Sequence, residues 1–211
     1  MTQGHSHPQG RLLVITAPSG AGKTSLVNAL IERNPRLKVS ISYTTRKARP
    51  HELADREYHF IDRAQFEQMQ RAGAFLEHAQ VFDHYYGTGR DAVQQLLQTG
   101  TDVVLEIDWQ GARQVRAAMP DCISIFILPP SRSALQERLE KRQSDSAEVI
   151  ARRLRDAVGD MSHYREFDYV VVNDHFERAL ADLERIVAGD GGSLRADRPG
   201  LQPLIAHLLT P

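Results

Sequence analysis

Polar and apolar residues follow two periodicities that alternate along the chain. Short runs that are apolar, or that alternate with polar residues, are typical of strands, and apolar residues three and four apart indicate helices. The runs typical of strands are 12–15, 38–43, 57–61, 75–82, 102–107, 122–128 and 169–172. Helices are predicted after Thr24, after Asp62, at 92–97 and 110–119, after Ser131, and at 147–165, 176–187 and 204–209. Because strands alternate with helices, the pattern predicts an α/β protein whose parallel sheet is covered by helices on both faces, which makes three layers.

Side chains that suit helix and turn ends refine this prediction. Asp62, Ser131 and Asp174 are predicted to cap the helices that follow them. Residues 83–87 are predicted as a turn.

The first predicted strand runs directly into a glycine-bearing loop and a helix. Residues 17–24 read APSGAGKT, which matches the phosphate-binding pattern GxxxxGK[ST] of a P-loop except that Ala17 replaces the first glycine. Alanine fits there when its φ is negative, while Gly20 and Gly22 let backbone N–H groups approach an anion at the helix N-terminus. A plain turn from strand to helix needs no Gly-Lys-Thr. The loop therefore predicts a nucleoside triphosphate site with Mg²⁺, in which Lys23 reaches the β- and γ-phosphates and Thr24 places its hydroxyl on the metal. The predicted loop residues are Ala17, Pro18, Ser19, Gly20, Ala21, Gly22, Lys23, Thr24 and Ser25.

Composition gives no reason to expect nucleic acid or a membrane as a partner. The 211 residues suit one domain with inserted subdomains, and a formal net charge of −1 offers no global attraction to polyanions. No apolar stretch approaches the roughly 18 residues that span a bilayer, and the N-terminus lacks the pattern of a signal peptide, so a cytoplasmic protein is expected. Cys122 is the single cysteine; it excludes an intrachain disulfide and is expected to be a small buried hydrophobe.

A second cluster of charges and hydroxyls suggests a second substrate. Arg46 and Arg49 lie three residues apart in a charged loop, close enough to converge on one anion, and Tyr58 and Tyr86 bring hydroxyl groups that could donate to it. A solvated charged loop is the alternative interpretation of the same arginines. The strand at 102–107 delivers carboxylates at its C-terminal edge, as an α/β nucleotide site requires.

Several stretches resemble bacterial guanylate kinase over nearly the whole chain. They are APSGAGKTS, SYTTRKARP, EYHF, FLEHAQVFDHYYGT, DVVLEIDWQGARQV, SIFILPPS and VIARRLRDAVGDMSHYREFDYVVVND. The run TTRxxRP, followed by FLEHAxVF and YYGT, is more specific than the P-loop. The resemblance implies Mg²⁺-dependent transfer of the γ-phosphate of ATP to GMP, and also to dGMP, in purine nucleotide metabolism and GMP recycling.

The resemblance also implies a role for each matching residue. It implies that the GMP phosphate is held by Arg46, Arg49, Tyr58 and Tyr86, and that guanine is read by Ser42, Glu77, Thr88 and Asp108. The arginines implied to neutralise the triphosphate as a lid closes are Arg138, Arg142 and Arg153, alongside Lys23. Asn173 is implied to lie near the ATP adenine, and Glu106 is assigned to orient a water molecule on Mg²⁺.

The chemistry of guanine supports a carboxylate reader independently. Guanine presents N1–H and the 2-amino group as adjacent donors that one carboxylate can accept together. Adenine has an acceptor at N1 and lacks the amino group, so it would leave a buried carboxylate facing a lone pair.

The domain organisation follows the same resemblance. The prediction is a P-loop NTPase core at 11–43 and 88–188 with a helical lid at about 138–153, a small mixed α/β GMP-binding insertion at 44–87, a leader at 1–10 and a tail at 189–211. This chain has Lys141 and Gln143 in the lid, and His51 and Asp55 in the insertion, where many relatives have glycine, while Gly89 stands where serine is common. Loss of glycine is expected to stiffen these loops.

Three other function classes are weighed against this prediction. A guanylate-kinase-like interaction module would share the fold, but such modules typically lack the phosphate-loop lysine and partner arginines that are present here. A P-loop kinase for another phosphorylated acceptor is disfavoured by Glu77 with Asp108, and a signalling GTPase by the absence of Asn-Lys-x-Asp. The sequence leaves a homo-oligomer open.

Overall fold

The computed structural model describes residues 9–48, 52–56, 58–81, 83–141 and 147–210. The strands are β1 (Leu12–Thr16), β2 (Leu37–Val39), β3 (Ser42–Thr44), β4 (Tyr58–Phe60), β5 (Phe75–Val81), β6 (His84–Gly89), β7 (Asp102–Glu106), β8 (Ile123–Leu128) and β9 (Tyr169–Val172). The α-helices are α1 (Lys23–Arg33), α2 (Arg63–Arg71), α3 (Arg90–Gln98), α4 (Trp109–Ala118), α5 (Arg132–Lys141), α6 (Ala147–Ser162), α7 (Phe176–Val187) and α8 (Gln202–Leu209). Short 3₁₀ helices are η1 (His163–Glu166), η2 (Gly192–Leu194) and η3 (Pro199–Leu201).

Within the described residues, the strands form a five-stranded sheet of order β2-β7-β1-β8-β9 and a four-stranded sheet of order β4-β3-β6-β5. In the larger sheet β2 pairs in parallel with β7, and β8 with β9. Its strands are apolar runs because both faces are covered, and every residue of β1 is buried. The predicted α/β class with a parallel sheet is confirmed.

The chain divides into two compact units, which are described separately. The first contains Met1–Val14 and Pro35–Ile123, and the second Ile15–Asn34 and Ser124–Pro211. The residue bounds predicted above for core, insertion and tail stay a prediction.

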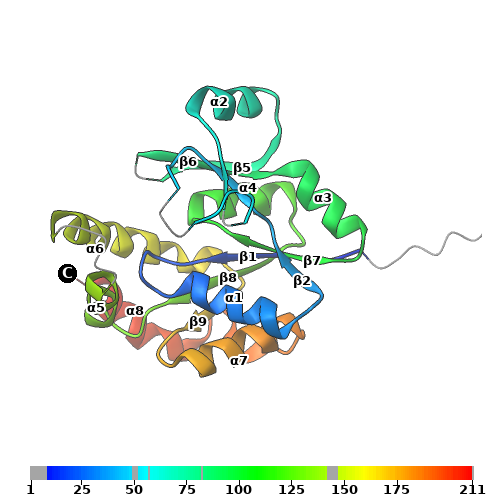
Figure 1. Ribbon diagram of the computed structural model, residues 1–211. Coiled ribbons are helices and arrows are strands. Elements are labelled where there is room, and N and C mark those ends of the chain that lie inside the picture. Colours follow the sequence, from blue (N-terminus) through cyan, green and yellow to red (C-terminus); the bar gives the residue numbers. More distant parts are fainter. Residues whose placement is uncertain (1–8, 49–51, 57, 82, 142–146, 211) are drawn as a thin grey trace, which may run out of the picture. The chain divides into compact units, whose positions relative to one another are not determined.

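Figure 1 shows α2 and α4 on opposite sides of β5 in the four-stranded sheet of the first unit. Strand β6 pairs antiparallel with β5 and β3, while β3 pairs in parallel with β4. Phe66 of α2 stacks on Phe75 of β5 with ring centroids 4.6 Å apart, and Asp62 caps α2 by accepting from the Gln65 N–H at 2.8 Å. Helix α4 packs on β5.

Two predictions in this unit are wrong. Residues 38–43 are not one strand, because after Ser40 donates its N–H to the Val104 carbonyl the chain leaves the parallel sheet and enters β3 of the other sheet. Residues 83–87 are not only a turn, since β6 begins at His84 and pairs with Val81 of β5. Pairing with a distant strand decides the first case, and a hairpin with the preceding strand decides the second.

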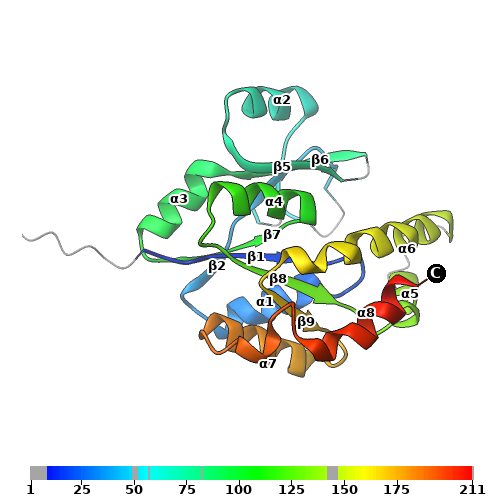
Figure 2. The same ribbon diagram turned by 180° about the vertical axis from the view of Figure 1, so that it is seen from behind.

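In the second unit, α1 lies beside α7 and α6 beside α8 (Figure 2). Ser131 caps α5 as predicted, with its hydroxyl accepting from the Ala134 N–H at 3.0 Å. The predicted cap of α7 is wrong by one residue: His175 is the N-cap, and Asp174 instead accepts from the His175 N–H and pairs with Arg178.

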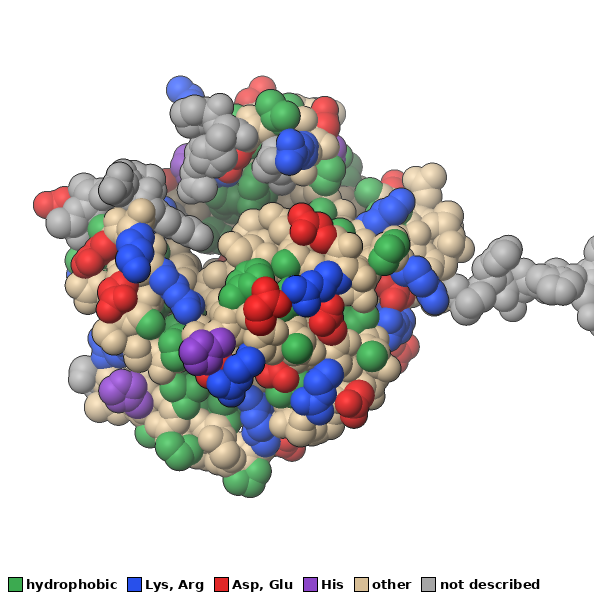
Figure 3. Space-filling view, turned by 60° about the horizontal axis from the view of Figure 1, so that its bottom comes forward, with side chains coloured by type: hydrophobic (Ala, Val, Ile, Leu, Met, Phe, Trp, Pro, Cys, Tyr) green, Lys and Arg blue, Asp and Glu red, His purple; other side chains and the backbone are tan. Residues whose placement is uncertain are grey.

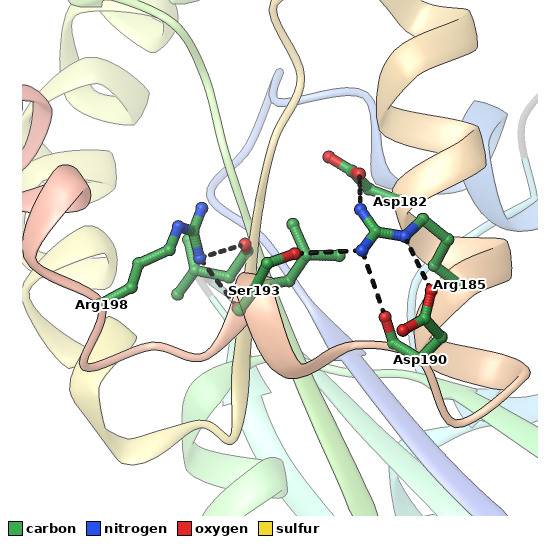
Figure 4. Close-up of polar contacts among 7 residues, drawn as sticks. Asp182, Arg185, Asp190, Ser193 and Arg198 are labelled. Carbon is green, nitrogen blue, oxygen red and sulfur yellow. Dashed lines mark hydrogen bonds and ion pairs between the residues drawn. The ribbon is translucent and has the colours of Figure 1, made fainter.

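Two arginines tie the C-terminal segment to the second unit (Figure 4). Arg198 donates to the carbonyls of Val170 and Leu194, at 2.9 and 2.8 Å. Arg185 contacts Asp182, Asp190 and Ser193. Leu201 and Leu208 are buried. These contacts show that the tail packs on its own unit.

Charged side chains of both signs are interspersed on the face shown in Figure 3. Ion pairs on α1 and α7 include Arg33–Glu177 and Arg178–Asp174. Across the described part of the chain, no helix combines the length and apolarity needed to span a bilayer. Cys122 is buried, as predicted.

Asp102 at the start of β7 is a buried carboxylate that holds the segment before β1. It accepts from the Arg11 backbone N–H at 2.8 Å and from the Arg11 guanidinium at 2.6 Å. Burial alone would raise the pKa of Asp102, but the side-chain and backbone hydrogen bonds from Arg11 and its charge outweigh burial and lower that pKa.

This pair predicts a dependence of stability on pH. Because the folded carboxyl has the lower pKa, its contribution is present above the unfolded-state pKa of about 4 and is lost as pH falls through the folded value. We expect the free energy of unfolding, measured in urea from pH 6 to pH 2, to fall less steeply for Asp102→Asn than for wild type. Exposed Asp121→Asn is the control that should keep the wild-type slope; equal slopes for Asp102→Asn and wild type would contradict the role of the pair.

Candidate active site

The phosphate loop at 17–22 joins β1 to α1 in the second unit. Gly20 and Gly22 have φ values of 89° and 93°, in the left-handed region that glycine adopts without a steric penalty. Gly22 is the N-cap of α1 and no side chain caps the helix there. The first N–H groups of a helix lack partners within it and favour an anion. Ala17 is not among the described residues with positive φ, so alanine fits this variant of the loop as predicted.

Two side chains from elsewhere in the second unit support the loop. Asn173, only 5% exposed, donates its amide N–H to the Ala21 carbonyl at 2.7 Å. Arg138 of α5 donates to the same carbonyl at 3.3 Å and to the Asn173 carbonyl at 2.9 Å. A Cβ built on Gly22 would lie 2.5 Å from Asn173 Nδ2, so glycine is needed there for space as well as for φ.

The predicted lid arginines are distributed over two packed helices. Helices α5 and α6 bury Leu135, Leu139 and Ala157 between them. Arg138 and Arg153 lie on α5 and α6, and Arg153 is half-buried. Arg142 and Gln143 lie outside the described residues. The roles of these arginines with ATP stay predictions.

Arg46 is the centre of a cluster of aromatic and charged side chains in the first unit. Its guanidinium donates to both carboxylate oxygens of Glu52, at 2.8 and 2.9 Å, and the two side chains are only 14% and 7% exposed. The guanidinium also lies 5.4 Å from the Tyr58 ring centroid. The hydrogen bonds that Arg46 donates to Glu52 raise the pKa of Arg46 above its ordinary value, so Arg46 is cationic.

Tyr58 and Tyr86 lie beside this cation with their rings edge to face, 5.9 Å between centroids. Burial, and then the nearby Tyr86 and Glu106, raise the pKa of Tyr58 to about 12. The Tyr58 hydroxyl therefore keeps its proton at neutral pH and can donate to an anion. Arg49 and His51 lie outside the described residues. Of the four predicted phosphate contacts, the structure brings together Arg46, Tyr58 and Tyr86.

Asp55 in the same loop has φ 62°, a left-handed conformation that favours glycine. Its carboxylate lies 2.6 Å from His59 Nδ1. Glycine adopts this backbone geometry most easily, and aspartate is among the side chains that tolerate it.

The predicted guanine readers form what we call the base-reading cluster: Ser42, Glu77, Thr88 and Asp108. Glu77 of β5 is 3% exposed, and its Oε1 accepts from the Thr88 hydroxyl at 2.6 Å. The Thr88 hydroxyl lies 3.5 Å from that of Ser42. Asp108 caps α4 by accepting from the Gly111 N–H at 2.8 Å. Gly111 also adjoins the Glu77 carboxylate, so both carboxylates approach the first turn of α4.

Three residues of these clusters have no assigned role in the sequence analysis. Glu52 is one charge among several in the loop sequence. Its buried ion pair with Arg46 distinguishes it from the others. Gln114 exchanges two hydrogen bonds with the backbone of His78, at 3.1 and 2.7 Å, and Gly111 lies against Glu77. The one available signal is that 108, 111 and 114 repeat at intervals of three on a predicted helix.

The residues present also fit a magnesium ion bound with a nucleotide. Thr24 lies in the first turn of α1, directly after the phosphate loop. A hydroxyl oxygen together with phosphate oxygens is the hard donor set that Mg²⁺ prefers, with few protein ligands. Among the described residues there is no group of three or more His, Cys, Asp or Glu placed to hold a metal by themselves.

A parallel α/β sheet, a glycine loop at a helix N-terminus and a separate cation–tyrosine cluster define a P-loop kinase of the nucleoside monophosphate class. The sequence model of the guanylate kinase family matches residues 9–189. The chain is 57% identical over 201 residues to the guanylate kinase of Methylococcus capsulatus, covering 95% of this chain and 98% of that one. It is 49% identical over 203 residues to the guanylate kinase of Escherichia coli K12, covering 95% and 98%.

A solved structure gives the same result. The crystal structure of guanylate kinase from Anaplasma phagocytophilum matches with a TM-score of 0.73 at 31% identity, over 97% of this chain and 98% of that chain. The chain belongs to the guanylate kinase family. The resemblance identified from the sequence motifs is thereby confirmed.

The support of the phosphate loop yields a testable prediction. Asn173→Ala removes the shorter hydrogen bond to the Ala21 carbonyl, so we expect the free energy of unfolding in urea to fall by about 1–3 kcal/mol. Affinity for ATP should fall with it, because the loop loses its support. Asn34→Ala is the matched control: it removes an amide bond to the Leu30 carbonyl of 2.7 Å outside the loop. Equal ATP affinities for Asn173→Ala and Asn34→Ala would contradict the support role.

Proposed function

We propose that this chain transfers the γ-phosphate of ATP to GMP, and to dGMP, in a Mg²⁺-dependent reaction that serves purine nucleotide metabolism and GMP recycling. The observation that carries the proposal is the buried Glu77 carboxylate, held by Thr88 and close to Asp108 beside Gly111. Membership of the guanylate kinase family supports it.

The choice of guanine rests on the acceptor capacity of Glu77. The Thr88 hydroxyl donates to one oxygen of this carboxylate and orients it. A carboxylate only accepts hydrogen bonds, which matches the adjacent N1–H and 2-amino donors of guanine. A 6-oxo group would suit the hydroxyl donor of Ser42, because the Thr88 hydroxyl donates its proton to Glu77. Adenine offers no such donors, and a buried carboxylate without partners is costly.

The GMP phosphate is assigned to Arg46, Arg49, Tyr58 and Tyr86. Both guanidinium NH2 groups of Arg46 donate to the Glu52 carboxylate. An incoming phosphate would therefore meet a cation whose orientation is already fixed. The phosphate would bind Arg46 either together with Glu52 or in its place. Tyr58 supports the same role because its hydroxyl is protonated at neutral pH.

The ATP phosphates are assigned to the phosphate loop, with Lys23 at the β- and γ-phosphates. Asn173 is assigned to the adenine end, and Arg138, Arg142 and Arg153 to the charge that develops on the transferred group. When bound, Mg²⁺ held by Thr24, with Glu106 acting through water, would neutralise phosphate charge. A cytoplasmic location stays an expectation, and the oligomeric state stays open.

The proposal is tested by the choice of acceptor. In a coupled assay for ADP with purified protein, ATP and Mg²⁺, we expect GMP and dGMP to be used and AMP to be disfavoured by about 10⁴-fold in kcat/KM. UMP and CMP should be poor acceptors, and removal of Mg²⁺ with EDTA should abolish turnover. ADP release that is no faster with GMP than without it, or a preference for AMP, would sink the proposal.

The base-reading role is tested separately by Glu77→Ala. We expect kcat/KM for GMP to fall by about 10²- to 10⁴-fold, since guanine loses two charge-assisted hydrogen bonds, while KM for ATP changes little. Glu67→Ala on α2 is a control for a surface glutamate, which pairs with Arg63 of its own helix. Unchanged GMP kinetics in Glu77→Ala would defeat the assignment of Glu77.

A further inference from the structure

One face of helix α4 lies against the strand that carries Glu77. Asp108, Gly111 and Gln114 follow at intervals of three, which places them on the same side of the helix. Helix α4 packs on β5, and Figure 1 shows the two elements adjacent in the first unit. The contacts made by this face reach the Glu77 carboxylate and the backbone beside it.

Gly111 leaves room for the carboxylate. A Cβ built on Gly111 would overlap Glu77 Oε2 and lie 3.0 Å from Glu77 Cδ and 3.3 Å from Asp108 Oδ1. Non-bonded contacts of this kind are comfortable at about 3.5 Å, so the carboxylate would have to move by about 1 Å. Thr88 holds the other oxygen of Glu77 at 2.6 Å, so the carboxylate would turn out of its present plane.

The backbone of Gly111 does not itself require glycine. Gly111 is inside α4 and is not among the described glycines with positive φ. Glycine inside a helix costs about 1 kcal/mol relative to alanine. Glycine at this position is therefore unfavourable for the helix and is explained by the space that Glu77 occupies.

Gln114 fixes the strand next to that carboxylate. Its Oε1 accepts from the His78 N–H at 3.1 Å and its Nε2 donates to the His78 carbonyl at 2.7 Å. The side-chain amide thus pairs with β5 as a neighbouring strand would. Because His78 directly follows Glu77, this pairing fixes the position of Glu77 along the axis of α4.

We propose that Gly111, assisted by Gln114, is a specificity-determining positioning residue: the bare Cα lets the Glu77 carboxylate lie in the plane that accepts both N1–H and the 2-amino group of guanine. This inference rests on the proposed function and adds to it a residue that touches no substrate. It predicts that a single methyl group on α4 weakens the preference for guanine.

The test is Gly111→Ala, measured against Gly159→Ala as a matched control. Gly159 is also helical, in α6, and a Cβ there would meet nothing within 4 Å. Gly159→Ala should have a thermal midpoint equal to or above that of wild type because alanine favours the helix, whereas in Gly111→Ala the displaced carboxylate should offset this gain. In Gly111→Ala we expect KM for GMP to rise by about 10- to 100-fold, as expected for a misplacement of about 1 Å, with KM for ATP unchanged.

A second readout separates positioning of the carboxylate from general damage. Inosine monophosphate has the N1–H but lacks the 2-amino group, so it depends on one oxygen of the carboxylate and not on both. We expect the GMP-to-IMP ratio of kcat/KM to fall by about 10-fold in Gly111→Ala and to stay at the wild-type value in Gly159→Ala. Glu77→Asp, which shortens the side chain, should make the added effect of Gly111→Ala smaller than in the wild-type background.

Each outcome decides the question. A Gly111→Ala enzyme with wild-type KM for GMP and a wild-type GMP-to-IMP ratio overturns this inference while the proposed function stands. A wild-type protein that does not use GMP defeats the proposed function, and this inference with it. Should Gly111→Ala fail to fold, Gln114→Ala tests the same geometry: a higher KM for GMP alone supports the inference, and an unchanged one overturns it.

Discussion

Both functional clusters depend on a side chain that approaches a bare Cα. In the second unit, Asn173 reaches the phosphate loop because Gly22 has no Cβ, and its amide then holds the Ala21 carbonyl. In the first unit, the Glu77 carboxylate lies against Gly111 at the start of α4. A buried polar side chain needs nearby hydrogen-bond partners. It can come this close to a Cα atom only where that residue is glycine and has no Cβ.

The buried charges of the first unit follow one rule. Asp102 is paired with Arg11, Arg46 with Glu52, and Glu77 is held by Thr88. An isolated buried charge would be neutralised by a shifted pKa or would destabilise the fold, whereas a paired one keeps its ionisation state. The partners differ in kind: Asp102 accepts from both the backbone and the side chain of the cation Arg11, while Glu77 accepts from the neutral hydroxyl of Thr88.

Much of the fold and of the candidate site follows from local pattern. The apolar run of β1, the glycines after it and the caps Asp62 and Ser131 act within a few residues of one another, and each was predictable. The errors have three causes: pairing with a distant strand, pairing within a hairpin, and a helix cap misplaced by one residue. Residues 38–43 separate into two strands because Val104 takes the Ser40 N–H, and His84 begins a strand because it pairs across to β5. The motifs also named Ser42, Glu77 and Thr88 as one recognition group, which the structure brings together.

The sequence by itself determined the class of the fold, the phosphate loop and the family, because these depend on residue type and spacing along the chain. Only the tertiary structure decided which groups support the functional residues: Glu52 beneath Arg46, Asn173 beneath the phosphate loop, and Gly111 with Gln114 beside Glu77. These contacts join residues that are not adjacent in the chain, and their strength depends on distances and burial. Neither quantity exists until the chain has folded.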